Sequence, residues 1–261
     1  MKKLARYGCY SIAVVYALVG VMAILSFMGL PEDAADEERI MNILMGFQLG
    51  KVVIVLITAG LTGYVIWRFY EAFTDQYNYG SGVSAIARRT GIALSALGYV
   101  IIAWAALQVL IQGSSNGEED QQQLIARVLQ FPAGEWLVGL AGAVLGFAGL
   151  VQIKYVASGE YQQRIDLESM SPRLRKLTKV LAWSGYLART VILLILGYFI
   201  LSAAILSNPR ESGDTDTAFD FIGSFGTMGH IMFNAVALGT ISYGVFMVLH
   251  GYFYSFRQEQ N

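Results

Sequence analysis

Three related stretches of the sequence decide the fold: RYGCYSIAVVYALVG at 6–20, RTGIALSALGYVIIA at 89–103 and WSGYLARTVILLILG at 183–197. The three can be laid over one another without a gap. Each has a glycine near its start and a small residue twelve positions later, the pairs being Gly8 and Gly20, Gly91 and Ala103, and Gly185 and Gly197. The chain therefore contains three repeats of one apolar helical segment.

The composition places these segments in a membrane. The chain has 261 residues, of which 14% are charged, and a mean hydropathy of +0.51. Soluble domains average about 25% charged residues, so this chain lacks the polar surface of a water-exposed globule. The charges cluster and leave six apolar stretches, at 7–31, 52–67, 90–117, 136–153, 190–209 and 221–256. With its flanks each stretch supplies the roughly 20 residues of a membrane span.

The six spans form three helical hairpins. Repeat 1 is expected over 1–80 with helices at 8–29 and 50–73, repeat 2 over 84–160 with helices at 91–112 and 135–156, and repeat 3 over 177–257 with helices at 183–206 and 229–254. Each unit crosses twice, so successive units have the same orientation, as parallel repeats do. We predict an all-α polytopic membrane protein whose hairpins either close into a ring with pseudo-threefold symmetry or pack as an irregular bundle.

Each hairpin also carries a short segment between its two spans. These segments read RIMNILMGFQLG (39–50), LIARVLQFPAG (124–134) and AFDFIGSFGTMG (218–229). Their apolar residues recur at helical spacing, which predicts short amphipathic turns along the outer membrane surface.

The distribution of basic residues fixes the orientation. If the N-terminus lies in the cytoplasm, the inner segments hold 13 Lys and Arg residues and the outer loops hold three. Under the positive-inside rule this bias predicts that both termini are cytoplasmic, in a bacterial inner membrane. The longest inner loop contains four of these residues, Arg173, Arg175, Lys176 and Lys179, and membrane lipids are therefore expected partners.

The chain resembles the bacterial membrane family known as domain of unknown function 1206. The resemblance is carried by RYGCYSIAVVYALVG, by GLTGYVIWRFYEAF (60–73), by GLVQIKY (149–155) and above all by DLESMSPRLRKLTKVLAWSGYLAR (166–189). It covers nearly the whole chain and implies three two-helix repeats. The first unit departs from the usual pattern, because it lacks the arginine that the third unit keeps as Arg189. The family implies no activity.

Ionisable groups inside membrane spans are expensive and are candidates for function. Lys51, Glu135 and His230 align at one position, each directly after a glycine at the outer end of a second helix. In a ring they would converge as a gate, a ligand site or a clasp, whereas at the interface they would anchor to headgroups, which we favour. Asn234 lies one turn after His230 and either extends this outer cluster or bonds to another helix.

A second group of ionisable residues is expected at the inner side. Arg68 and Glu71 are three residues apart on one helix face and can form an ion pair. Arg189 lies about 9 Å along its helix from Trp183. Its guanidinium either reaches the inner interface or binds a lipid phosphate or a carboxylate such as Glu71.

The clearest packing signal is a stripe of four glycines on one face of the fourth span, Gly139, Gly142, Gly146 and Gly149. Small residues at this spacing let helix backbones approach closely, so we assign the stripe to helix packing.

No catalytic constellation stands out. The sequence contains no Walker A loop, no H-E-x-x-H and no G-x-S-x-G. Cys9 is the single cysteine, and His230 and His250 are about 30 Å apart on one helix, so no metal or other cofactor is expected. Nucleic-acid binding is unsupported.

These observations lead to two hypotheses for function. The first is a non-enzymatic accessory or scaffold subunit that packs with other membrane proteins or lipids. The second is a small channel or transporter with its path along the pseudo-threefold axis, which requires Lys51, Glu135 and His230 to converge.

Overall fold

The computed structural model describes residues 2–28, 45–46, 50–74, 80, 82–113 and 117–255, and this part of the chain is helical, with one isolated bridge between Ile165 and Tyr254 and no strand. The long helices are α1 (Lys2–Phe27), α3 (Gly50–Thr74), α4 (Val83–Gln112), α6 (Gly134–Ala157), α7 (Pro172–Ile205) and α9 (Gly226–Tyr252). The short ones are α5 (Gly117–Leu129), η1 (Glu160–Arg164), η2 (Pro209–Glu211) and α8 (Thr215–Gly223). The all-α prediction is confirmed for the described residues.

Five of the long helices, α1, α3, α6, α7 and α9, are long and apolar enough to cross a membrane. The helix α4 has 30 residues, and its described apolar stretch, Ile102–Gln112, is shorter than a span. The structure thus shows several helices able to span a membrane, and α4 as a sixth span stays a prediction.

Three of the helices begin earlier than the apolar stretches do. The helix α1 begins at Lys2 rather than near 8, α4 at Val83 rather than near 91, and α7 at Pro172 rather than near 183. The start of α7 is fixed by Ser171, whose hydroxyl accepts a hydrogen bond from the Leu174 N–H, and by proline at the first helical position. Hydropathy locates the membrane-crossing part of a helix, whereas capping decides where the helix begins.

Short helices lie in two of the three segments for which amphipathic turns are predicted, and their place along a membrane surface stays a prediction. The helices α5 and α8 precede α6 and α9, and α8 begins at an Asp214 cap that accepts the Thr217 N–H. Phe219 and Ile222 of α8 are buried, so its apolar face lies against the bundle. The corresponding segment of repeat 1, at 39–50, lies outside the described residues apart from 45–46 and Gly50.

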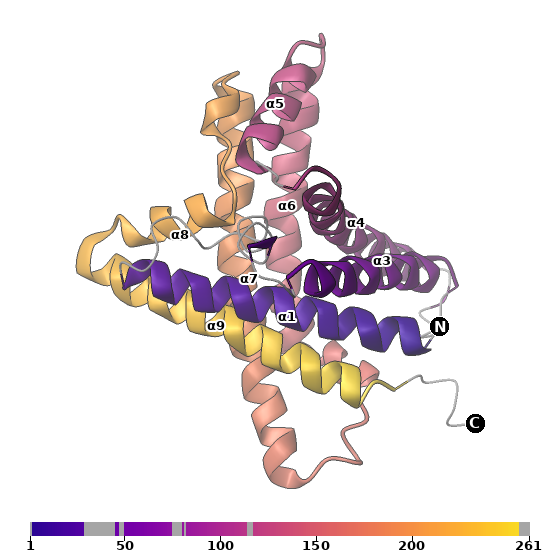
Figure 1. Ribbon diagram of the computed structural model, residues 1–261. Helices are drawn as coiled ribbons and strands as arrows, with labels where there is room; N and C mark the ends of the chain where they lie inside the picture. The colour runs from indigo at the N-terminus through magenta and orange to yellow at the C-terminus, as the bar shows by residue number, and fades with distance from the viewer. Residues whose placement is uncertain are drawn as a thin grey trace.

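The long helices pack in three pairs, α1 with α9, α3 with α4, and α6 with α7 (Figure 1). Each pair joins the second helix of one hairpin to the first helix of the next, and the last hairpin returns to the first. Within the hairpins, α1 packs on α3 and α7 on α9, whereas α4 and α6 make no extensive contact. The helices therefore follow the order α6, α7, α9, α1, α3, α4, and this series stays open between its two ends.

Glycines allow the backbones of α6 and α7 to approach each other closely. A Cβ added to Gly142 would lie 2.8 Å from the Leu201 backbone nitrogen, and one added to Gly197 would lie 2.8 Å from the Gly146 nitrogen. At Gly149 the two backbones are bridged, because Thr190 Oγ1 donates to the Gly149 carbonyl at 3.1 Å. A Cβ on Gly139 would lie in ordinary contact with Ala204, 3.6 Å away, and one on Gly146 would meet no atom within 4 Å.

The same contacts recur between different helices. Gly8 of α1 lies against Tyr64 of α3, and the aligned Gly185 of α7 lies against Tyr243 of α9. Between hairpins, Gly244 of α9 meets the Ala13 carbonyl of α1, just as Gly149 of α6 meets the Thr190 carbonyl of α7. The repeats seen in the sequence are thus repeats of packing as well.

Candidate functional site

A half-buried arginine lies where four of the long helices meet. Arg189 comes from α7, and its Nη1 donates to the hydroxyl of Tyr99 on α4 at 3.0 Å and to the hydroxyl of Tyr243 on α9. Its Cζ also lies 5.0 Å from the ring centroid of Tyr16 on α1 and 4.5 Å from that of Tyr243. We call Arg189, Tyr16, Tyr99 and Tyr243 the arginine–tyrosine cluster.

The repeats place these tyrosines. Tyr16 and Tyr99 each follow the aligned glycine of a first helix, Gly8 or Gly91, by eight residues. Tyr243 occupies in the third hairpin the position that Tyr64 occupies in the first, and Tyr64 stacks edge-on against Tyr99 at 5.0 Å. Tyrosines from all three hairpins therefore meet around one arginine that only the third hairpin has at its aligned position.

The charge of Arg189 is stabilised without a carboxylate. Within the part of the chain that the structure describes, no Asp or Glu lies within ion-pair distance of its guanidinium. Two hydroxyls and three aromatic rings surround it instead, and a cation over an aromatic ring contributes about 0.5–2 kcal/mol. An unpaired buried ion costs several kcal/mol, so these contacts offset only part of the desolvation.

A second buried cluster lies where the C-terminal end of α3 meets η1. The Glu71 carboxylate is 2% exposed and forms ion pairs with Arg68 on its own helix at 3.0 Å and with Arg164 of η1 at 2.5 Å. The predicted pairing of Arg68 with Glu71 is therefore present. Glu71 does not reach Arg189, so that alternative for Arg189 is wrong: the carboxylate is already held by two other arginines.

The C-terminal end of α9 lies beside the ion-pair cluster of Arg68, Glu71 and Arg164. The imidazole of His250 is buried and stacks on the Tyr254 ring with centroids 5.2 Å apart. The Tyr254 hydroxyl accepts a hydrogen bond from Trp67 Nε1 at 3.0 Å, and the Asp166 N–H donates to the Phe253 carbonyl at 2.8 Å. The inner loop and the end of α9 are thereby fastened to the inner end of α3.

The four predicted outer residues have separate surroundings. Lys51 and Glu135 are exposed, and Glu135 accepts a hydrogen bond from the Ser207 hydroxyl. His230 is exposed and lies edge-on against Phe27 at 5.2 Å, while Asn234 donates to the His230 carbonyl. No hydrogen bond, ion pair or ring contact joins Lys51, Glu135 and His230 to one another among the described residues.

A metal site is not apparent. Among the residues that the structure describes, no group of three or more His, Cys, Asp and Glu side chains is placed to hold a metal ion. Cys9 is buried in the apolar core of α1.

Comparison with known proteins agrees with this architecture. The family model described as Domain of Unknown Function (DUF1206) matches residues 7–75, 90–158 and 184–254. The chain belongs to this family. The three matched segments each contain one hairpin, so the family unit is the structural repeat.

A curated relative extends over nearly the same length. The uncharacterized protein YxxB of Bacillus subtilis (strain 168) is 30% identical over 251 residues, which cover 96% of this chain and 90% of the relative. No solved structure matches the chain. Family membership therefore brings the fold pattern and no activity.

Sequence reasoning singled out Arg189, Arg68 and Glu71 and predicted the Arg68–Glu71 pair, but it missed the partners of Arg189 and the second partner of Glu71. Tyr16 and Tyr99 carried a usable signal, because both occupy the same repeat position in apolar spans. Arg164 and Tyr254 carried none, because the loop and the chain end that hold them meet only in the folded protein.

Proposed function

We propose that this protein is a non-enzymatic accessory or scaffold subunit of a bacterial cytoplasmic membrane, which packs with another membrane protein and with lipids. The single observation that carries the proposal is the incomplete burial of α6. In the most apolar 18 residues of α6, 17% of the residues are buried, against 50% in the corresponding stretch of the equivalent helix α9. Helices at equivalent positions in three repeats should be covered to a similar extent, and among the described long helices α6 packs extensively on α7 alone.

The uncovered surface of α6 is large and apolar. It includes exposed Trp136, Leu137, Leu140, Phe147, Leu150 and Val151. The small residues Ala141 and Ala143 are exposed as well, and the Cβ direction of Gly146 points into open space. Small residues beside large ones allow the backbone of a second helix to approach, which favours a partner helix over lipid tails at this surface.

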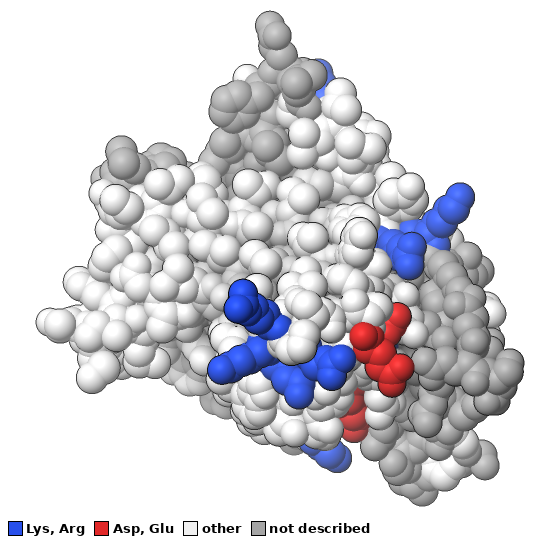
Figure 2. Space-filling view, turned by 90° about the horizontal axis from the view of Figure 1, so that it is seen from below, with Lys and Arg blue, Asp and Glu red and all other residues white. Residues whose placement is uncertain are grey.

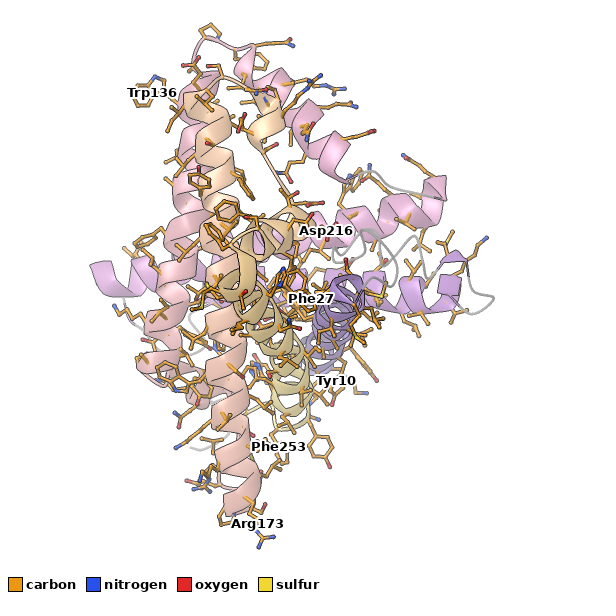
Figure 3. All side chains as sticks on the ribbon, turned by 90° about the vertical axis from the view of Figure 1, so that its left-hand side faces the viewer. Tyr10, Phe27, Trp136, Arg173, Asp216 and Phe253 are labelled. Atoms are coloured by element: carbon orange, nitrogen blue, oxygen red, sulfur yellow. The ribbon has the colours of Figure 1, made fainter. Side chains whose placement is uncertain are left out.

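The proposed orientation places both termini in the cytoplasm. Arg173, Lys176 and Lys179 are exposed on the first turns of α7, and Figure 2 shows Lys and Arg side chains gathered on this end of the molecule. Trp136 lies at the opposite end of the α6–α7 pair from Arg173 (Figure 3). The helix α1 begins and α9 ends on the same side in Figure 1, as an even number of spans requires.

The channel hypothesis finds no such support. Its path needed Lys51, Glu135 and His230 to converge, and these residues have separate contacts. The arginine–tyrosine cluster joins side chains of α1, α4, α7 and α9, and none of the three aligned residues belongs to it. We therefore make no second proposal.

Cysteine-directed photo-crosslinking tests the proposal. Leu150 of α6 and Ile66 of α3 are 52% and 51% exposed, and each lies sixteen residues after the glycine that begins its helix. In a Cys9→Ser background, Leu150→Cys labelled with a photoreactive maleimide in native membranes should give one protein adduct of fixed mass. The matched Ile66→Cys should give none.

A neighbouring position on α6 serves as a repeat of this test. Phe147→Cys should give the same adduct, because Phe147 and Leu150 are exposed on the same helix and lie close to one face. Equal labelling from α3 and α6, or no protein adduct from either position of α6, would refute a partner at this surface.

A further inference from the structure

We propose that the arginine–tyrosine cluster binds an oxyanion, the carboxylate or phosphate of a membrane amphiphile. This inference does not depend on the accessory role, because it rests on the interior of the bundle and not on the outer surface of α6. It assigns a ligand class to a group of residues that have no other evident use.

The first argument is charge. Arg68 and Arg164 share the Glu71 carboxylate, so both inner arginines have a counter-ion within the chain. Arg189 differs from these two arginines, because no carboxylate of the described residues lies within ion-pair distance of it. Its environment of neutral hydroxyls and aromatic faces tolerates a cation but leaves its charge uncompensated. A bound oxyanion would supply the missing charge.

The second argument is donor geometry. Both hydrogen bonds of Arg189 use Nη1, whereas Nε and Nη2 donate to no residue that the structure describes. Neither is a fully buried atom, so each retains surface for a ligand. The N–H bonds of Nε and Nη2 are parallel along one edge of the guanidinium, and this fork matches the two oxygens of a carboxylate or phosphate.

The third argument concerns the two hydroxyls. Tyr99 and Tyr243 accept from Nη1, and their oxygens lie 3.4 Å apart. Each phenol accepts through its oxygen and keeps one proton to donate. At most one of these protons lies between the two oxygens, so at least one remains for an oxygen of the ligand. The cluster thus offers up to three donors to one anion.

The fourth argument explains why the anion should carry an apolar chain. Arg189 lies about 9 Å along α7 from Trp183, inside the apolar span. Ile192 and Ala188 of α7 are buried, and the described residues of α4 and α6 make no extensive contact with each other. As part of the proposal, we place the acyl chain between those two helices, with its charged group at Arg189. Free inorganic phosphate would have to leave water to reach the same donors.

Binding to the purified full-length protein in detergent tests the site with defined probes. Oleate and lysophosphatidic acid carry the two oxyanions, oleyl alcohol has a matching chain without a charge, and inorganic phosphate has a charge without a chain. We expect oleate or lysophosphatidic acid to bind and raise Tm, and oleyl alcohol to bind at least tenfold more weakly.

Variants connect this binding to the cluster. Arg189→Gln should weaken oleate or lysophosphatidic acid binding at least tenfold, and Arg189→Lys should weaken it less, because lysine keeps the charge and loses the fork. The matched control is Arg127→Gln, which removes the same charge from an exposed position on α5 and should leave binding unchanged. Tyr99→Phe and Tyr243→Phe each remove one oxygen and should weaken binding several-fold.

The outcomes separate clearly. Binding of inorganic phosphate with the same dependence on Arg189 would keep the oxyanion site and assign its ligand to the aqueous phase. Equal binding of oleate and oleyl alcohol, or binding unchanged in Arg189→Gln, would overturn the proposal. If Arg189→Gln does not fold, unchanged binding in both phenylalanine variants would overturn it instead.

Discussion

Glu71 shows how a membrane protein keeps charges in its interior. One carboxylate lies between two arginines from different parts of the chain, and all three groups are largely withdrawn from water. The cluster has a net charge of +1, and Arg164 brings η1 and the inner loop onto α3 through it. The ion pairs therefore specify how the loop after the second hairpin docks on the first.

Replacing Glu71 by glutamine tests this reading at the residue scale. The amide keeps the shape but leaves two buried arginines without a counter-ion, and losing one partner of a buried pair costs about 3–5 kcal/mol. We expect a marked fall in Tm for Glu71→Gln, measured by thermal unfolding in detergent. Glu168→Gln, at an exposed position of the same inner loop, should change Tm little. Equal Tm values for both variants would show that the Glu71 ion pairs do not stabilise the fold.

At the scale of residues, only some of the contacts could be predicted from the sequence. Spacing on one helix was enough to predict the Arg68–Glu71 pair, and Arg189 stood out as a charge inside an apolar span. The tyrosines around Arg189 come from three other helices, so their meeting depends on tertiary packing. The same limit applies to Arg164 and Tyr254, which are brought together by backbone hydrogen bonds between an inner loop and the chain end.

At the scale of elements, pairs of helices are held by contacts between backbones. The stripe on α6 shows that glycines in one row are not equivalent. A Cβ on Gly142 would collide with backbone and side-chain atoms of Leu201, whereas a Cβ on Gly146 would meet nothing within 4 Å. Sequence spacing placed both residues on one face, but only the approach of α7 tells which of them needs to be glycine.

This difference predicts opposite effects of the same substitution. Gly142→Ala should destabilise the protein by about 1–3 kcal/mol, because a methyl group is forced into a packed interface. Gly146→Ala should be neutral or stabilising by up to about 1 kcal/mol, because alanine is the better helix former. Thermal unfolding of the two variants side by side measures the difference. A larger loss for Gly146→Ala would contradict the described packing of α6 on α7.

For the molecule as a whole, hydropathy and repeats led to the right fold class and family. They did not show the order in which helices pair. Glycine contacts join α6 to α7 and α9 to α1, and α3 packs along α4. Pseudo-threefold closure would need α4 to pack on α6 as well, and the structure leaves these two helices apart.

The orientation of the whole molecule gives a prediction about accessibility. Ser169 lies in the inner loop and Ser224 between α8 and α9, and both are exposed. In a Cys9→Ser background, a membrane-impermeant maleimide should label Ser224→Cys in intact cells. Ser169→Cys should react only after lysis, because the positive-inside rule places it in the cytoplasm. The reverse pattern would invert the proposed topology.

The uncovered surface of α6 makes the assembly state the central question. Native mass spectrometry of the protein, gently extracted from its own membranes, tests the accessory role most directly. We predict a complex in which this chain is bound in fixed stoichiometry to another membrane protein, and we predict that this complex is lost when Phe147 and Leu150 are both replaced by lysine. A monomer or homo-oligomer carrying only lipid would contradict the account.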